Sequence, residues 1–199
     1  MSEKLPAVYL ARHGETAWSL SGQHTGLTDL PLTEKGERNA QQLGKRLSEI
    51  QFNKVLTSPL QRARKTCELA GFGGVAEIDG NLVEWNYGDY EGRRSVEIAS
   101  MNSGWQLFRD GCPGGESPGQ VAARADQVIA RVRAITGDVL IFSSGHFLRM
   151  FAARWLGLEP VAGKFFMLQT ASLSVLSYEH ELSRPVVLLW DDTHHLAGH

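Results

Sequence analysis

The chain has 199 residues, of which 42% are hydrophobic, and its 20 Lys and Arg against 22 Asp and Glu give a formal net charge of −2. This length suits one domain with a sizeable core, and the balanced charge argues against nucleic acid or an anionic membrane as partner. The sequence offers no pattern of a signal sequence, no apolar run of the ~18 residues that span a membrane, and no metal-ligand spacing at Cys67 and Cys112. We therefore expect a reduced, cytoplasmic protein.

The first part of the chain alternates β-rich runs with amphipathic segments. Apolar residues spaced by three or four, such as Ala40, Leu43 and Leu47, indicate a helix, and short runs of β-forming residues indicate strands. In chain order we predict a strand at Leu5–Ala11, a helix capped by Thr33, a strand at Val55–Thr57, a helix opened by a capping box at Ser58–Gln61, and a strand at Val75–Ile78.

The second part begins with an irregular, aromatic-rich stretch, residues 82–118, in which we predict one short helix after Arg94. We interpret this stretch as a lid or insertion within a single domain that spans residues 1–199. In chain order we then predict a helix capped by Ser117, a strand at Val139–Phe142, an apolar helix from Ser143–His146 to Leu156, and strands at Ala171–Tyr178 and Pro185–Trp190.

This order of elements predicts the fold class. Strands that alternate with helices favour a three-layer α/β/α sandwich with a mostly parallel central sheet. The last two strands have no helix between them, so we expect an antiparallel pair at one edge.

Three polar loops follow predicted strands. They contain Arg12 and His13, then Ser58 to Arg62, and then Ser143 to His146. In open α/β sheets, ligands bind beyond the carboxyl ends of the strands. Two guanidinium groups, two imidazoles and helix N-terminal amides would together suit a phosphate or another oxyanion. Each loop alone has an ordinary structural explanation, and their shared position favours a phosphate site.

Motifs in a fixed order carry a more specific signal. They lie at Leu10–Thr16, Thr25–Asp29, Pro31–Gly36, Thr57–Thr66, Glu84–Gly92 and Ser144–His146. Together they resemble the histidine phosphatase superfamily, the phosphoglycerate mutase-like phosphatases, and span most of the chain. Trp105 and the segments Arg109–Cys112 and Gly115–Ser117 are most similar to its broad-specificity acid phosphatases and sugar-bisphosphate phosphatases.

The resemblance implies roles for individual residues. His13 would be the nucleophile that forms a phosphohistidine, and Glu84 would protonate the leaving oxygen and later deprotonate water. The phosphoryl oxygens would be held by Arg12, Arg62 and His146. Substrate-binding positions would further include Ser19, Thr25, Gly26 and Arg109, the last toward a second phosphate or a carboxylate. The scheme needs no metal or cofactor, and its partner is a small phosphorylated metabolite.

The residue types suit this chemistry. A neutral imidazole is a good nucleophile when an acceptor such as a backbone carbonyl holds its other nitrogen protonated. Arginine forks and a charged His146 would spread the charge of the transferring phosphoryl group. Burial beside Trp85 or Tyr87 would raise the pKa of Glu84, as a general acid requires.

Three other functions have some support. Gly115–Gly119 fits the G-x-S-x-G motif of serine hydrolases, but loop residues precede it where that motif needs a strand, so an N-cap explains Ser117 better. A non-catalytic phosphate-binding module is a remote alternative, because His13 and Glu84 are both present. Phosphoglycerate mutase activity at the same site is the nearer alternative, although Ser19 and Arg93–Ser95 depart from the mutase pattern.

Several features stay open at this point. His24 lies near expected substrate-facing groups and is equally consistent with an exposed position. The aromatic residues Trp18, Trp85, Tyr87 and Trp105 either line the mouth of the site or form packing contacts. The C-terminal histidines, which are His194, His195 and His199, are expected to bind metal adventitiously or to have no role. A homo-oligomer is left open by the sequence.

Overall fold

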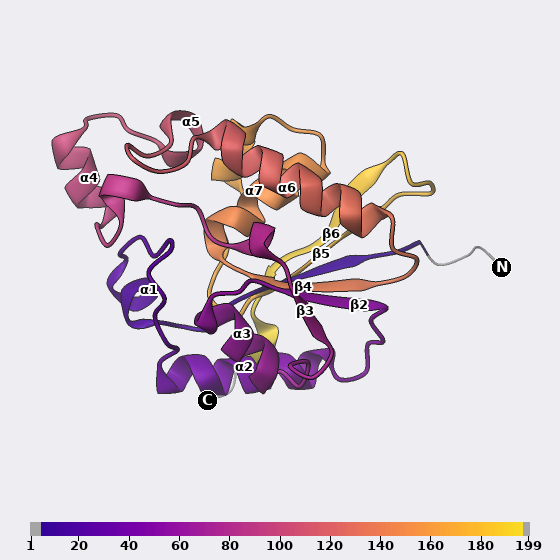
Figure 1. Cartoon of the computed structure of the whole chain (residues 1–199). Coiled ribbons are helices and arrows are strands. Elements are labelled where there is room, and N and C mark those ends of the chain that lie inside the picture. Colours follow the sequence, from indigo (N-terminus) through magenta and orange to yellow (C-terminus); the bar gives the residue numbers. More distant parts are fainter. Residues whose placement is uncertain (1–4, 197–199) are drawn as a thin grey trace.

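The computed structural model describes residues 5–196, which fold around one six-stranded sheet (Figure 1). The strands are β1 (Val8–Arg12), β2 (Lys54–Thr57), β3 (Ala76–Ile78), β4 (Val139–Ser143), β5 (Leu173–Tyr178) and β6 (Pro185–Asp192). Their order is β3-β2-β4-β1-β5-β6. Strands β1 to β4 pair in parallel, whereas β5 pairs antiparallel with β1 and with β6. The predicted mixed sheet with an antiparallel edge is confirmed.

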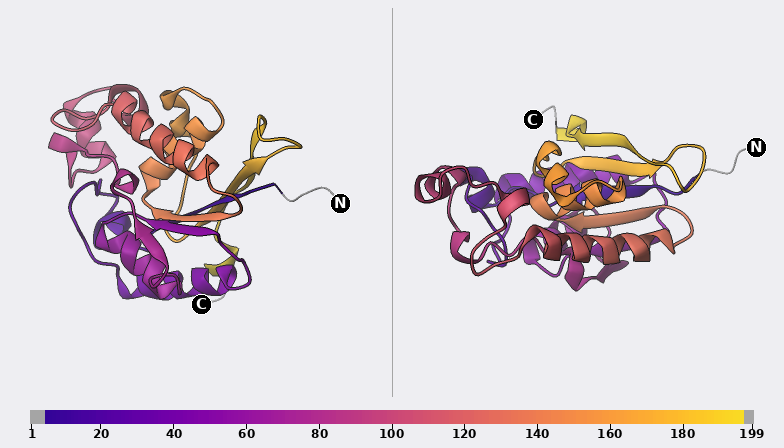
Figure 2. Two further views of the ribbon diagram at one scale, coloured as in Figure 1. Left: turned by 45° about the vertical axis from the view of Figure 1, so that its right-hand side comes forward. Right: turned by 90° about the horizontal axis from the view of Figure 1, so that it is seen from above.

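Helices cover both faces of the sheet, as a three-layer sandwich requires. The helices are α1 (Ala17–Ser21), α2 (Glu34–Leu47), α3 (Gln61–Leu69), α4 (Ser95–Met101), α5 (Leu107–Asp110), α6 (Pro118–Arg133) and α7 (Gly145–Trp155). Helices α2 and α3 lie on one face and α6 and α7 on the other, while α1, α4 and α5 lie beyond the carboxyl ends of the parallel strands (Figures 1 and 2). Short 3-10 turns complete the chain at Gly80–Leu82, Gly88–Tyr90, Pro160–Phe165 and His194–Leu196.

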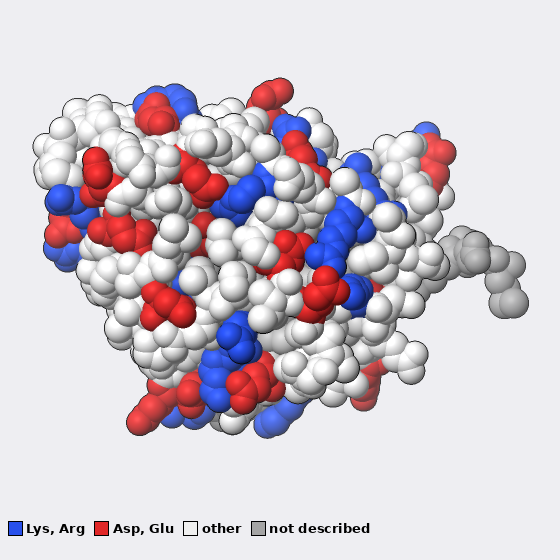
Figure 3. Space-filling model, in the orientation of Figure 1, with Lys and Arg blue, Asp and Glu red and all other residues white. Residues whose placement is uncertain are grey.

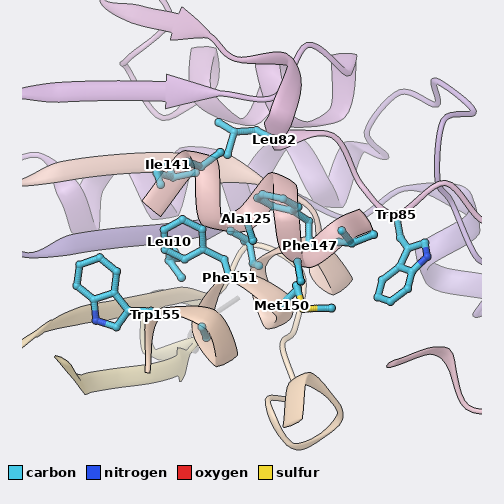
Figure 4. Packing of buried hydrophobic residues seen from close by; sticks show 14 of the residues in the cluster. Leu10, Leu82, Trp85, Ala125, Ile141, Phe147, Met150, Phe151 and Trp155 are labelled. Carbon is cyan, nitrogen blue, oxygen red and sulfur yellow. The ribbon is translucent and has the colours of Figure 1, made fainter. Parts of the chain in front are cut away.

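Two apolar clusters hold the layers together. The larger one, seen in Figure 4, joins the sheet to α6 and α7 through residues such as Ile141, Phe147 and Phe151. The smaller one joins the opposite face to α2 and α3 through residues such as Leu43 and Phe142. Strand β4 is buried along its whole length because it contributes to both clusters. This rigid centre fixes the loops that leave β1, β2 and β4.

Three predicted element starts are wrong, and the first is that of β1, which begins at Val8 and not at Leu5. Helix α3 begins at Gln61, after Leu60, and not at a Ser58 capping box. The carboxylate of Asp29, from a distant segment, accepts a hydrogen bond from the Gln61 backbone at 2.8 Å and so replaces the local cap. Strand β5 begins at Leu173, since Ala171 has a left-handed backbone with φ of 56° that does not continue a strand.

Other local predictions are confirmed or incomplete. Thr33 caps α2, and Ser117 caps α6 in a capping box with Gln120. The short helix after Arg94 is α4. The sequence pattern missed α1 and α5, which have only five and four residues, because so short a segment shows no helical periodicity.

The surface carries mixed charge. In the face shown in Figure 3, Lys and Arg are interspersed with Asp and Glu, and neither sign forms a continuous patch. Within residues 5–196, no helix is both long enough and apolar enough to cross a membrane.

Candidate active site

A cavity of about 190 Å³ opens where the loops after β1 and β4 meet the segments around α1 and α4. Its lining consists of Arg12, His13, Ser19, Gly22, Gln23, His24, Thr25, Glu84, Tyr87, Ser95, Gly145, His146, Arg149 and Leu168. Six of the predicted site residues are in this lining. The structure thus brings together groups that the sequence separates by more than 130 residues.

His13 follows β1 and is 4% exposed. Its Nδ1 lies 2.7 Å from the carbonyl oxygen of Gly14, which is an acceptor only, so Nδ1 carries the proton and Nε2 keeps its lone pair. Burial lowers the pKa of His13 well below its usual value, and the charges of Arg62 and Arg12 lower it further. His13 is therefore a neutral imidazole with a nucleophilic nitrogen at neutral pH.

The two predicted arginines flank His13 in different ways. Arg12 lines the cavity, and its Nη1 donates to the carbonyl of Leu168. Arg62 is 0% exposed and lies behind the lining, where its guanidinium donates to the carbonyls of Thr25, Gly26 and Thr28 at 2.7–3.1 Å. These acceptors are uncharged, so they do not neutralise either cation.

Within the described part of the chain, the Nε atoms of Arg12 and Arg62 are buried without a hydrogen-bond partner. The hydroxyl of Ser144, the N-cap residue of α7, is also unpartnered. Burial lowers the pKa of both arginines, against the raising effect of Glu84. An oxyanion would supply the missing negative charge and acceptors.

Glu84 is 4% exposed and lies at the N-terminus of α7. Its Oε1 accepts from the backbone of Trp85 at 2.9 Å and of Phe147 at 2.7 Å, and its Oε2 accepts from the backbone of His146 at 2.9 Å. The helix amides therefore fix the carboxyl group in the cavity wall. Trp85 itself is fully buried, and its indole nitrogen donates to the carbonyl of Glu116.

His146 is held by Tyr87. The phenolic oxygen of Tyr87 lies 2.5 Å from His146 Nδ1. Burial raises the pKa of Tyr87 well above its usual value, so the phenol keeps its proton and donates it to Nδ1. Burial, with the charge of Arg149, lowers the pKa of His146 well below its usual value. The expected charged His146 is thus not favoured in this structure, where a neutral ring with the proton on Nε2 can still donate to a phosphoryl oxygen.

His24 lines the cavity and is buried, so the exposed alternative is wrong. Its ring stacks on His146 at 5.9 Å between centroids and meets the edge of Tyr87 at 4.8 Å, and its Nδ1 donates to the carbonyl of Arg93 at 2.8 Å. Trp105 contacts the ring of His24 at 5.9 Å. The rings of His24, Tyr87 and His146 line the cavity, whereas Trp105 contacts His24 without being part of the lining.

The remaining predicted substrate contacts are placed differently. Ser19 and Thr25 line the cavity, but the Ser19 hydroxyl is already engaged with the backbone of Thr16. Gly26 lies behind the lining, where its amide donates to Glu91 and its carbonyl accepts from Arg62. Arg109 is exposed, pairs with Asp110 at 2.7 Å and is not part of the lining.

Arg149 is a cavity residue that the sequence reasoning missed. It lies three residues after His146 on α7, so the two side chains share one helix face. Its guanidinium stacks over the ring of Phe108 at 4.8 Å and donates to the carbonyls of Gly163 and Lys164. The helical spacing from His146 is a signal that could have identified it.

Two of the C-terminal histidines, His194 and His195, are not part of the cavity lining. His194 is exposed, whereas the Nε2 atom of His195 lies 2.8 Å from the carbonyl of Ala171. His199 lies outside the described residues. Among the described side chains, no three His, Cys, Asp or Glu residues are grouped so that they could hold a metal ion.

Comparison with known proteins identifies the family of the chain. Residues 8–193 match the histidine phosphatase superfamily (branch 1). An acid phosphatase of Mycobacterium tuberculosis is 40% identical over 183 residues, which cover 90% of each chain. A sedoheptulose 1,7-bisphosphatase of Saccharomyces cerevisiae is 36% identical over 190 residues, which cover 79% of this chain and 70% of the yeast protein.

Solved structures extend the similarity to the fold. A Mycobacterium tuberculosis protein of known structure superposes with a TM-score of 0.89 at 38% identity, covering 94% of this chain and 98% of the other. The chain belongs to the histidine phosphatase superfamily and is a phosphatase.

Proposed function

We propose that the enzyme hydrolyses small phosphomonoesters through a phosphohistidine on His13, with Glu84 as general acid and base and without a metal ion. The observation that carries this proposal is the state of His13. Its Nδ1 proton is held by Gly14, and burial beside two arginines keeps the ring neutral. A buried histidine in this state, facing an anion-binding cavity, is suited to attack phosphorus.

The first step transfers the phosphoryl group to the enzyme. His13 Nε2 forms a bond to phosphorus while the bond from phosphorus to the ester oxygen breaks. Glu84 gives its proton to that oxygen, which leaves as an alcohol. Arg12, Arg62 and the Nε2 proton of His146 stabilise the charge on the three remaining oxygens.

The second step releases phosphate. Glu84, now a carboxylate, takes a proton from a water molecule as the water oxygen bonds to phosphorus. The bond from phosphorus to His13 Nε2 breaks, and inorganic phosphate leaves. The backbone amides that bind Glu84 hold it in place for both proton transfers.

The cavity supports a small substrate with a second anionic group. Its volume of about 190 Å³ is below the roughly 300–1,000 Å³ of sites for drug-sized ligands. Arg149 adds a cation to the wall beside His146, away from Arg62. A sugar bisphosphate or a phosphorylated carboxylic acid would satisfy both cationic ends, and the bisphosphatase relative from yeast supports this class.

The decisive experiment traps the intermediate. Acid-sensitive phosphate should appear on the wild-type enzyme when it is quenched with alkali or denaturant during turnover of a radiolabelled monoester, and should be absent from H13A. H194A removes an exposed histidine outside the cavity and is the matched control, which should label normally. Wild-type turnover by H13A would refute the mechanism.

Two further measurements test the proposal. Phosphate release should persist in EDTA, and strong inhibition by the chelator would contradict a metal-independent reaction. Phosphoglycerates should lose phosphate and not merely isomerise. Interconversion of phosphoglycerates without release of phosphate would favour the mutase alternative.

A further inference from the structure

The loop of residues 167–172, which we call the support loop, connects directly to the phosphoryl site. The carbonyl of Leu168 accepts from the guanidinium of Arg12, and the carbonyl of Ser172 accepts from the Arg12 backbone at 3.2 Å. The amide of Ala171 donates to the carbonyl of His13 at 3.0 Å. Three hydrogen bonds from one loop therefore set the position of two adjacent site residues.

The outer side of the support loop is held by strand β6. The carboxylate of Asp191 accepts from the Gln169 backbone at 2.6 Å and from the Gln169 side chain at 3.2 Å. The indole nitrogen of Trp190 donates to the carbonyl of Met167 at 2.6 Å, while its ring meets Phe166 at 5.2 Å. Neither Trp190 nor Asp191 lines the cavity.

A β-bulge aims these side chains at the loop. Between the pairs Val175–Leu189 and Leu173–Asp192, β5 advances by two residues and β6 by three. Asp191 lies at this irregularity with φ of 54°, and its amide donates to the Ser174 hydroxyl at 3.0 Å. A left-handed backbone is costly for most side chains, and bulges of this kind re-aim side chains next to active sites.

We propose that Asp191 is a positioning residue of the phosphoryl site, which acts by holding the support loop so that Leu168 and Ala171 orient Arg12 and His13. The inference rests on the proposed function, because it assigns Arg12 and His13 to phosphoryl binding and transfer. Asp191 belongs to β6, which is the last strand at one edge of the sheet, so a residue outside the cavity controls groups inside it.

Electrostatics support the same connection. Burial lowers the pKa of Arg12, and the charge of Asp191 is among those that raise it again, together with Glu84. The negative charge of Asp191 thus partly offsets the cost of burying the Arg12 cation, although Asp191 neither contacts Arg12 nor lines the cavity. The cation stays available to an oxyanion.

The test compares D191G with D126A. Glycine deletes both hydrogen bonds to Gln169 and tolerates the left-handed backbone. D126A is the control, because it also removes a carboxylate that accepts two hydrogen bonds. These bonds come from Arg154, and Asp126 lies on the distant helix α6. For p-nitrophenyl phosphate we expect kcat of D191G to fall about 10- to 100-fold, as misplaced reacting groups do, and D126A to stay within about 2-fold.

Calorimetric titration with inorganic phosphate separates positioning from folding. In D191G the Kd should rise about 10-fold with unchanged stoichiometry, whereas loss of folded protein lowers the stoichiometry and leaves Kd unchanged. D191N keeps the shape and an acceptor for the Gln169 amide, so it should recover kcat to within about 3-fold. If D191G does not fold, the test uses W190F, which loses only the hydrogen bond to Met167 and keeps the ring packing. This variant should show the same rise in the Kd for phosphate.

Three results would overturn the proposal: wild-type kcat and Kd in D191G, reduced stoichiometry at unchanged Kd, or a D191N as impaired as D191G. For W190F the refuting result is an unchanged Kd. If the wild-type enzyme releases no phosphate while D191G still raises Kd for phosphate, the hydrolytic function fails and the positioning role stands.

Discussion

The substitution E84Q tests the general acid by a contrast between leaving groups. Three backbone amides donate to the Glu84 carboxylate, two of them to Oε1 and one to Oε2. A glutamine can place its carbonyl oxygen at Oε1 and keep the first two bonds. Its amide group then faces the His146 amide at the Oε2 position, and one donor meets another donor.

The expected sizes follow from these contacts. Loss of a general acid costs about 10²- to 10⁴-fold in rate, and this loss applies to glycerol phosphate, whose alkoxide must be protonated. The weakly basic p-nitrophenolate leaves without that help, so we expect its kcat/KM, which reports only the transfer of the phosphoryl group to His13, to fall less than about 10-fold. The donor clash should cost about 1–3 kcal/mol of unfolding free energy, which lowers the Tm by about 2–12 °C at about 2–4 °C per kcal/mol.

The assay measures kcat/KM for both substrates on E84Q at temperatures well below its Tm, because kcat also includes hydrolysis of the phosphohistidine, in which Glu84 acts as base whichever substrate was used. E91Q is the matched control, since Glu91 also binds two backbone amides through Oε1 and does not line the cavity. It should affect both substrates equally and by less than about 3-fold. Equal losses for the two leaving groups in E84Q would remove Glu84 from the acid role.

Three further outcomes are expected. Burial lowers the pKa values of His13 and His146 well below 6.5 in the folded state, so below about pH 6.5 the unfolded chain binds more protons than the folded chain. Urea unfolding should therefore show that the free energy of unfolding decreases as the pH is lowered below about 6.5, and that it decreases less steeply in H13N. R149M should raise KM about 10-fold or more for a sugar bisphosphate and less than about 3-fold for a monophosphate, and equal changes would argue against a second anion site. S117A should lose about 1 kcal/mol of stability from its N-cap with kcat unchanged, whereas abolished activity would revive the serine-hydrolase alternative.

Much of the fold was predictable because its signals are local. Each buried strand is a short β-rich run, and α2 and α6 carry both helical periodicity and a side-chain cap. Asp29 caps α3 from a segment 32 residues away, which no local pattern reveals. The positive φ of Ala171 depends likewise on its bonds to neighbouring segments.

The candidate site was predictable for the residues that chemistry restricts in type. His13, Arg12, Glu84 and His146 stand in motifs after strands, and the cavity brings them together. Arg109 was assigned from residue type alone, and its pairing with Asp110 shows why type is insufficient for a surface arginine. Asp191 could not be inferred, because its position depends on a bulge in an edge strand.

The buried charges explain how a chain of nearly neutral net charge can still offer a site suited to phosphate. Arg12 and Arg62 donate only to carbonyl oxygens within the described structure, and each has an unpartnered Nε. Burial, together with their charge, lowers the pKa of His13 and so favours the neutral imidazole that the proposed reaction needs. Binding a phosphate dianion offsets the desolvation of both cations and at the same time places phosphorus beside His13. The features that make the empty site costly to bury are thus the features that favour the bound phosphoryl group.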